Sequence, residues 1–218
     1  MGKELSEMSL EELWELFPIR LVPHSDKWKH YYDEMVIFLN SILSEEPIER
    51  ISHIGSTAIA NIWAKDIVDI LIEEPTDSDM EHTAKTMERN GFIRMSTEAG
   101  RISLNYGYTK EGFAERVFHV HLRYSGDHDE LYFRDYLNEH PQIAREYEEI
   151  KLRLWKQFEH DRDAYTNAKT AFIRTWTKEA KKVYAGVHSS EAGIPLSTAL
   201  PCVADHPTAA RRHPTANG

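Results

Sequence analysis

Cysteine is almost absent from this chain, because Cys202 is the only one among 218 residues. A single thiol excludes both an internal disulfide framework and a cysteine-based zinc site. The sequence also lacks an apolar run of the roughly 20 residues that a helix needs to cross a bilayer. Its first 17 residues are acidic and amphipathic, which is not the composition of a signal or transit peptide. We therefore expect a cytoplasmic protein with no membrane partner.

Basic residues are in the minority, since 26 Lys and Arg face 36 Asp and Glu and give a net charge of −10. An acidic body argues against binding of a nucleic-acid backbone. It does not exclude a small-molecule or nucleotide substrate whose phosphates are held in a local basic pocket. The hydrophobic content of 41% is ordinary for a globular protein and is enough for a sizeable core. The oligomeric state is left open by the sequence.

The stretch from residue 51 to residue 74 predicts a strand, a tight turn and a second strand. Gly55-Ser56 interrupts the first strand, and a glycine there lets the backbone approach a ligand closely. The backbone amides that follow can face an anion. The run from Ile67 to Ile72 is typical of a strand buried on both faces, yet it contains Asp69. A buried carboxylate is costly unless it is paired, hydrogen-bonded or bound to a cation.

Two interpretations of Asp69 follow. In the simpler one, its carboxylate caps a neighbouring turn or forms a buried ion pair with Arg116 or Arg123. In the other, it is a ligand for a metal ion or a substrate cation. We favour the second interpretation, because the Gly55-Ser56 turn precedes Asp69 by a single strand-to-strand connection.

Alternation over residues 116 to 123 predicts a further strand with His119 and His121 on one face. Two imidazoles at this spacing stand about 7 Å apart along the strand. They suit two ligands of one ion, or one ligand and one general base near neutral pH. Two histidines on a solvated sheet face, however, need no function. If this strand lies close to that of Asp69, the three side chains line one pocket.

Several motifs resemble the GrpB family. HIGSTAI, followed by AK and IVDILI, is similar to the family's usual HIGSTAVPGLxAKPIIDI. RLVPHSDKW, FRDYLNEHP, AYTNAKTAF and the Phe-His-x-His strand resemble further family motifs, so that the resemblance covers roughly residues 18 to 182. GrpB proteins look like a branch of the nucleotidyltransferase fold. In that fold a Gly-Ser turn holds a triphosphate, and acids on a strand hold two metal ions.

The resemblance implies metal-dependent transfer of a nucleotidyl group to a small-molecule acceptor. It assigns the phosphates to Gly55, Ser56, Thr57 and Lys65. It also implies a divalent cation (Mg, Mn or Zn) held by Asp69, His119 and His121, with Asp69 and His121 as the catalytic groups. The second acid of the nucleotidyltransferase pattern falls on Leu71, and one carboxylate with two imidazoles suits Mn²⁺ or Zn²⁺ better than two Mg²⁺. The alternatives are an inactive nucleotide- or phosphate-binding module and a structural interaction protein on the same fold.

The periodicities predict an α+β protein, in which a small mixed sheet is backed by helices and joined by a C-terminal helical section. The resemblance to GrpB implies that this sheet is nucleotidyltransferase-like. We expect a helical extension at residues 1–17, the α/β core at 18–125, packed helices at 126–185 and a disordered tail at 186–218. The expected strands are 19–22, 51–54, 67–72, 92–95, 101–108 and 116–123. The expected helices are 9–17, 25–43, 79–90, 127–140, 141–158 and 163–184.

Overall fold

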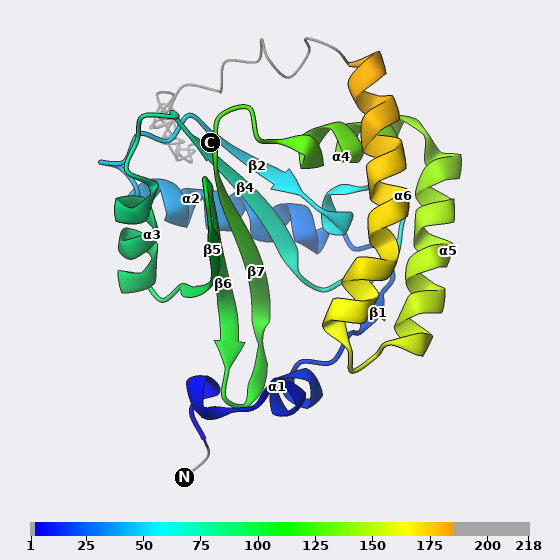
Figure 1. The fold of residues 1–218 in the computed structure, drawn as a ribbon, viewed down its shortest axis with the longest axis horizontal. Coiled ribbons are helices and arrows are strands. Elements are labelled where there is room, and N and C mark those ends of the chain that lie inside the picture. Colours follow the sequence, from blue (N-terminus) through cyan, green and yellow to red (C-terminus); the bar gives the residue numbers. More distant parts are fainter. Residues whose placement is uncertain (1–2, 185–218) are drawn as a thin grey trace, which may run out of the picture.

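The computed structural model describes residues 3–184, and the tail predicted at residues 186–218 lies outside the described residues (Figure 1). The α-helices are α1 (Leu10–Leu16), α2 (Lys27–Ile42), α3 (Met80–Arg89), α4 (Asp129–Glu139), α5 (Pro141–Gln157) and α6 (Arg162–Val183). The strands are β1 (Leu21–Val22), β2 (Arg50–Ile54), β3 (Ala64–Lys65), β4 (Val68–Glu74), β5 (Ile93–Glu98), β6 (Arg101–Thr109) and β7 (Gly112–Tyr124). Two short 3₁₀ helices, η1 (Leu5–Glu7) and η2 (Ser56–Ala58), complete the described part of the chain.

The main sheet has the strand order β2-β4-β7-β6-β5. Its β4–β7 pair is parallel and its other pairs are antiparallel, so the sheet is mixed. The α+β class, with a small mixed sheet backed by helices and a C-terminal helical section, is therefore confirmed. One local prediction is wrong, and one strand pairing was not predicted. The strand expected at 92–95 continues as β5 to Glu98, because it pairs with β6 through an irregular register. The pairing of β3 with β1 was not predicted, because two residues carry no periodicity.

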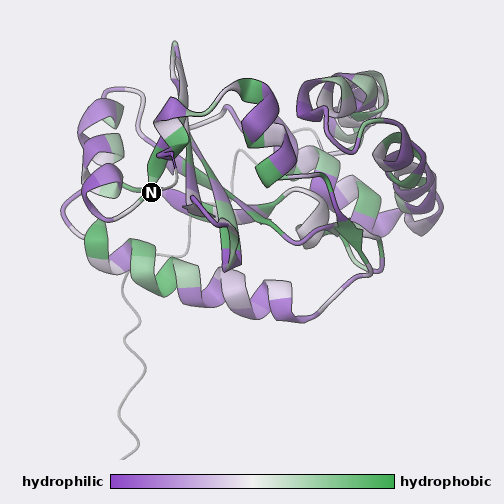
Figure 2. Ribbon diagram, turned by 90° about the horizontal axis from the view of Figure 1, so that it is seen from below, coloured by the Kyte–Doolittle hydropathy of each residue, from purple (hydrophilic) through white to green (hydrophobic). Residues whose placement is uncertain are grey.

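Alternate residues of the central strands form an apolar layer on one face of the sheet. Helices α2 and α3 cover this face, and the sheet lies between helical layers when it is viewed nearly edge-on (Figure 2). The buried members of this core include Trp28, Met35, Leu39, Val68, Ile70, Ile72, Met87, Phe118, Val120 and Leu122. Because side chains of a strand alternate, the residues between them must point to the opposite face, toward α4, α5 and α6.

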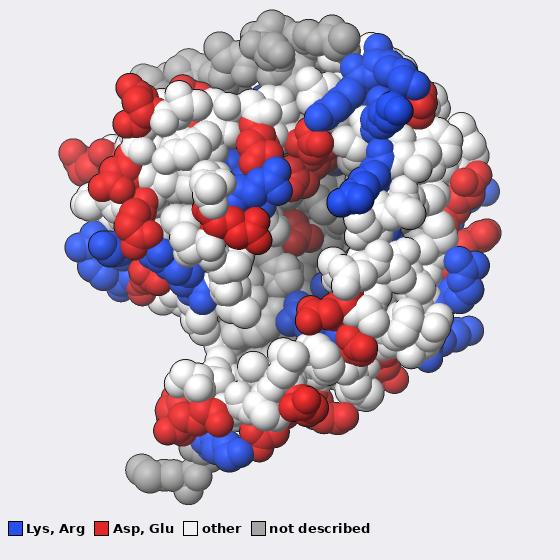
Figure 3. Space-filling model, in the orientation of Figure 1, with Lys and Arg blue, Asp and Glu red and all other residues white. Residues whose placement is uncertain are grey.

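The opposite face is only partly covered. Helix α4 places Leu131 over Leu71 of β4 and Ile54 of β2, and all three are buried. The C-terminal helices pack on each other and on the loop after η2 through a second core that contains Ile59, Ile62, Tyr136 and Tyr147. The space-filling view shows a hollow in this face of the molecule (Figure 3). None of the helices in the described chain is long and apolar enough to cross a membrane.

A buried ionic network fixes the loop that leads from β7 into α4. The Glu73 carboxylate, whose side chain is 3% exposed, accepts from Arg50 Nε at 2.5 Å and lies 2.7 Å from His128 Nδ1. It also accepts from the Gly126 amide at 3.3 Å. Burial alone would raise the pKa of Glu73, but the hydrogen bonds from Arg50 and His128 outweigh it and hold the pKa below its usual range. Glu73 is thus a structural acid.

We expect Arg50→Met to lower the free energy of unfolding by about 3–5 kcal/mol, because it leaves a buried carboxylate without its cation. Denaturant unfolding measures this change. The matched control is Arg101→Met, which breaks the exposed pair with Asp127 and should cost less than about 1 kcal/mol. Equal losses in the two variants would contradict the assignment of Glu73 to a buried network.

Candidate functional site

Asp69 faces the two histidines across the parallel β4–β7 pair, where its register partner is His119. Its Oδ1 atom lies 3.2 Å from His119 Nδ1 and 3.6 Å from His121 Nε2. The three side chains that the sequence placed in one pocket therefore do converge. The alternative, a buried ion pair with an arginine, is not observed, since Arg116 pairs with Glu34 and Arg123 Nε lies 3.8 Å from Asp127.

The cluster is held in a defined charge state by its hydrogen bonds. Burial would raise the pKa of Asp69, but hydrogen bonds with His119 and His121 outweigh it and lower the pKa, so the carboxylate is ionised. Burial lowers the pKa of His119 to about 4 and keeps this ring neutral at pH 7. Its Nε2 lies 2.8 Å from the Tyr108 hydroxyl. These partners assign the tautomer in which Nδ1–H donates to Asp69 and Nε2 accepts from Tyr108.

The Gly55-Ser56 turn touches Asp69 directly. Gly55 has φ 72° and ψ −170°, a conformation essentially reserved for glycine. A Cβ atom at this position would lie 2.3 Å from Asp69 Oδ2, so the turn and the carboxylate share one space that no other residue type fits. Ser56 forms a side-chain hydrogen bond with Tyr147 of α5. Thr57 is buried, and its Oγ1 lies 3.0 Å from His53 Nε2, so its hydroxyl supports the turn instead of facing a ligand.

Four basic side chains lie in this region. Lys65 of β3 and Lys169 of α6 interact with Asp69, Arg162 of α6 reaches the cluster through Tyr108, and Lys151 of α5 lies near Lys65. Among residues 3–184, no carboxylate forms an ion pair with any of them. Their observed partners are uncharged: Arg162 donates to the Tyr108 hydroxyl at 3.1 Å, and Lys151 donates to a backbone carbonyl. A group of cations without counter-ions is the charge distribution expected of an anion site.

The pKa values of the three lysines are lowered by burial and by repulsion from neighbouring basic groups. Burial, followed by repulsion from Arg162, lowers the pKa of Lys65 to about 8. Burial lowers the pKa of Lys151 to about 7. Burial, and then repulsion from Lys65 and Lys151, also lowers the pKa of Lys169. An anion placed among them would restore the charged forms and be bound in return.

Of these cations, only Lys65 was identified from the sequence. Two signals for the others were present. Lys151 lies in the apolar stripe of its helix, four residues after Tyr147 and three before Leu154, where a solvated lysine is not expected. Lys169 belongs to the AYTNAKTAF motif, whose resemblance to the family did not by itself assign this lysine to the site.

A cavity of about 480 Å³, here called the turn pocket, opens beside Gly55 and Ser56. Its other walls are Tyr147, the start of α4 with Asp129 and Glu130, and the side of α6 that carries Ile173, Arg174 and Lys178. Figure 3 shows Lys and Arg side chains gathered along α6 at the edge of a hollow in this face of the molecule. The turn pocket thus combines the glycine turn with positive charge from an element distant in sequence.

The residues present do not form a complete metal site on their own. In residues 3–184, no group of three or more His, Cys, Asp or Glu side chains is arranged to hold a metal ion. Leu71, at the position of the second acid, is fully buried beneath Leu131. The other nearby acids are occupied, since Glu73 binds Arg50 and Asp66 accepts from Lys27 and Trp28. Binding of a cation by Asp69, His119 and His121 therefore stays a prediction, and the missing ligands would have to come with the substrate.

We expect Gly55→Ala to destabilise the protein and to displace the Asp69 side chain. The backbone strain alone is worth roughly 1–3 kcal/mol, and the collision with Asp69 adds to it. The matched control is Gly126→Ala, which has φ 94° and no atom within 4 Å of the added Cβ. Thermal unfolding should show a larger loss for Gly55→Ala than for the control, and equal losses would show that Asp69 does not fill this space.

Comparisons with known proteins agree with this architecture. The family model described as GrpB protein matches residues 18–179. The glutamate-rich protein GrpB of Alkalihalophilus pseudofirmus is 33% identical over 166 residues, which are 70% of this chain and 90% of that protein. The UPF0157 protein YqkA of Bacillus subtilis is 32% identical over 193 residues, which are 85% of this chain but only 54% of that protein.

Solved structures give the same result. A crystal structure of GrpB from Enterococcus faecalis has a TM-score of 0.65 and 29% identity, and the match covers 76% of this chain and 99% of that one. This chain is also partly similar to the crystal structure of the Cid1 poly(U) polymerase with MgGTP bound. That match has a TM-score of 0.46 and 12% identity, and it covers 62% of this chain and 44% of the polymerase chain. No activity follows from a likeness of that size. The family match and the identities above establish that this chain belongs to the GrpB family.

Proposed function

We propose that this chain binds a nucleotide or a related phosphorylated small molecule, with the phosphates between the Gly55-Ser56 turn and the cations of the C-terminal helices. The observation that carries the proposal is the group of four cations, none of them ion-paired with a carboxylate in the described chain, beside an ionised Asp69. The protein as a whole has a charge of −10, so this positive group is not a property of its general surface.

The electrostatic argument favours a polyanion. Two like charges about 4 Å apart repel by about 4 kcal/mol at an effective dielectric constant of 20. Burial is the main cause of the lowered pKa values of Lys65, Lys151 and Lys169, and repulsion adds to it, since Arg162 repels Lys65 and Lys65 repels the other two lysines. A triphosphate supplies several negative charges on one chain of atoms, and therefore relieves the repulsion of several cations at once.

Asp69 opposes a bare phosphate, and this opposition favours a ligand that arrives with a divalent cation. Magnesium-type cations are commonly held by one or two carboxylates together with substrate phosphates. Asp69, with the imidazoles of His119 and His121, fits such a shared site, whereas it does not fit a site made of protein ligands alone. A cation held there would supply charge stabilisation at a phosphoryl oxygen.

Transfer of a nucleotidyl group to a small acceptor is a second candidate function. It is favoured by the ionised Asp69 beside the Gly55-Ser56 turn. It is also favoured by His121, whose Nε2 faces Oδ1 of Asp69. Leu71 in place of a second acid argues against the ordinary form with two metal ions. Release of pyrophosphate from a nucleoside triphosphate in the presence of candidate acceptors would reveal this activity.

The binding proposal is tested by calorimetric titration with tripolyphosphate and with nucleoside triphosphates, using Lys169→Met. We expect the variant to bind at least about tenfold more weakly, a loss of about 1.4 kcal/mol. Its unliganded form should be at least as stable as the original, because a crowded cation has been removed. The matched control is Lys156→Met on the exposed side of α5, which should bind normally. Equal affinities of Lys169→Met and the original protein would contradict the proposal, and so would the absence of binding to the original protein.

A further inference from the structure

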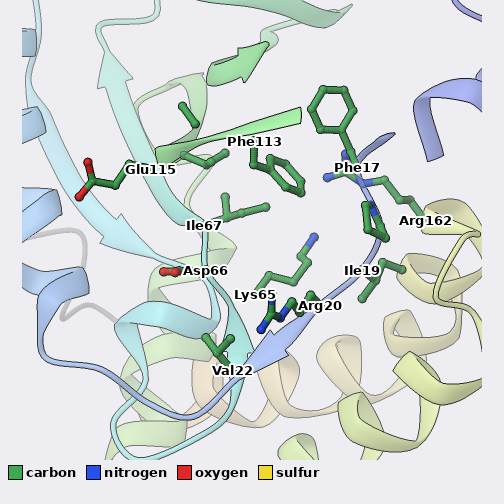
Figure 4. A pocket seen from close by; sticks show the side chains of 13 residues that line it. Phe17, Ile19, Arg20, Val22, Lys65, Asp66, Ile67, Phe113, Glu115 and Arg162 are labelled. Atoms are coloured by element: carbon green, nitrogen blue, oxygen red, sulfur yellow. The ribbon is translucent and has the colours of Figure 1, made fainter. Parts of the chain in front are cut away.

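A second cavity, here called the hairpin pocket, lies at the tip of the β6–β7 hairpin, where the chain leaves α1. It has a volume of about 290 Å³. Its apolar walls include Phe17, Ile19 and Phe113, and Figure 4 shows Lys65 and Arg162 directed into the space between them. This cavity has no lining residue in common with the turn pocket, so the two cavities are separate from each other.

The hairpin pocket is positively charged. It contains Arg20, Lys65 and Arg162, and none of these is ion-paired with a carboxylate within residues 3–184. Of its two acids, Asp66 is already bound to Lys27 at 2.7 Å. The other, Glu115, is exposed, and its carboxylate is directed away from Lys65 (Figure 4). The interior of the pocket therefore presents cations without counter-ions.

An aromatic side chain at the edge of the hairpin pocket is exposed to solvent. Phe113 is 38% exposed, one of the few large apolar side chains of the described chain with that much surface in water. Its ring lies 4.9 Å from that of the buried Phe17, and the ring of Tyr108 is tilted against Phe17 and packs edge-on against Phe113. An apolar ligand group placed against Phe113 would remove this surface from water, which is favourable.

A chain of polar contacts joins the hairpin pocket to the carboxylate of the candidate site. Arg162 donates to the Tyr108 hydroxyl at 3.1 Å, and this hydroxyl lies 2.8 Å from His119 Nε2. His119 Nδ1 is in turn 3.2 Å from Asp69. A ligand that binds Arg162 would therefore act on the same hydrogen-bond chain that orients His119.

From these observations we infer that the hairpin pocket is a binding site for a small carboxylate with a flat apolar body. The carboxylate lies against Lys65, Arg162 and Arg20. The guanidinium group of an arginine is a suitable partner, because its planar fork can donate two hydrogen bonds to one carboxylate. The apolar body lies against Phe113 and Ile19. The volume of about 290 Å³ accommodates a single ring with a short acidic chain and is too small for a nucleotide.

The test uses phenylacetate as the probe and the full chain, with binding followed by NMR titration. Acetate lacks the ring and phenylacetamide lacks the charge, so both should bind at least about tenfold more weakly than phenylacetate. The inference is overturned if phenylacetate does not bind, or if either analogue binds equally well.

Two pairs of variants locate the bound probe. Phe113→Ala and Arg20→Gln should each weaken phenylacetate binding by about tenfold. Met95→Ala removes another exposed apolar side chain, from β5, and Arg174→Gln removes a cation of the turn pocket, so both should bind phenylacetate normally. Losses in the controls that match those in the test variants would place the probe elsewhere and overturn the inference. Because this readout needs no nucleotide, it is independent of the proposed function.

Discussion

A carboxylate in the middle of an apolar strand is the constraint around which this structure is organised. Asp69 is tolerated in β4 because the parallel register with β7 sets His119 opposite it and His121 within reach of the same oxygen. The space on its other side exists only because residue 55 is a glycine. A shift of the β4–β7 register by one residue would turn both imidazoles to the opposite face and leave a buried, unpaired charge.

The C-terminal helices cover part of the sheet and also supply basic side chains to the candidate site. Helix α4 closes part of the sheet face by burying Leu71, and that closure leaves Asp69 without a second acid. Helix α6 brings Lys169 near the carboxylate and joins Arg162 to it through Tyr108 and His119, and helix α5 brings Lys151 near Lys65. The result is a recess with one ionised acid, a neutral histidine and several cations without ion-pair partners in the described chain, in a protein that is acidic overall. Such a charge arrangement suits a phosphorylated ligand accompanied by a cation better than it suits either one alone.

Much of this architecture could be predicted from local sequence patterns. Alternation in β4 and β7 gave the correct faces, and the motif around Gly55 located the turn, since both signals are carried by neighbouring residues. The cations of α5 and α6 could not be placed in this way, because their approach to Asp69 depends on how distant helices pack. The assignment of Thr57 to the phosphates stays a prediction, and local sequence did not indicate the contact of its hydroxyl with His53. The hairpin pocket likewise depends on the meeting of α1 and a distant hairpin, for which no local pattern exists.

The most direct test of the role of Asp69 is the affinity of Asp69→Asn for ATP, measured by calorimetry with and without Mn²⁺. In the original protein we expect Mn²⁺ to strengthen ATP binding. In Asp69→Asn that dependence should disappear, while the metal-free affinity should rise because a repelling carboxylate has been removed. Asp77→Asn, at an exposed loop position, should behave as the original protein does. An Asp69→Asn protein that folds and retains the full effect of Mn²⁺ would contradict the account.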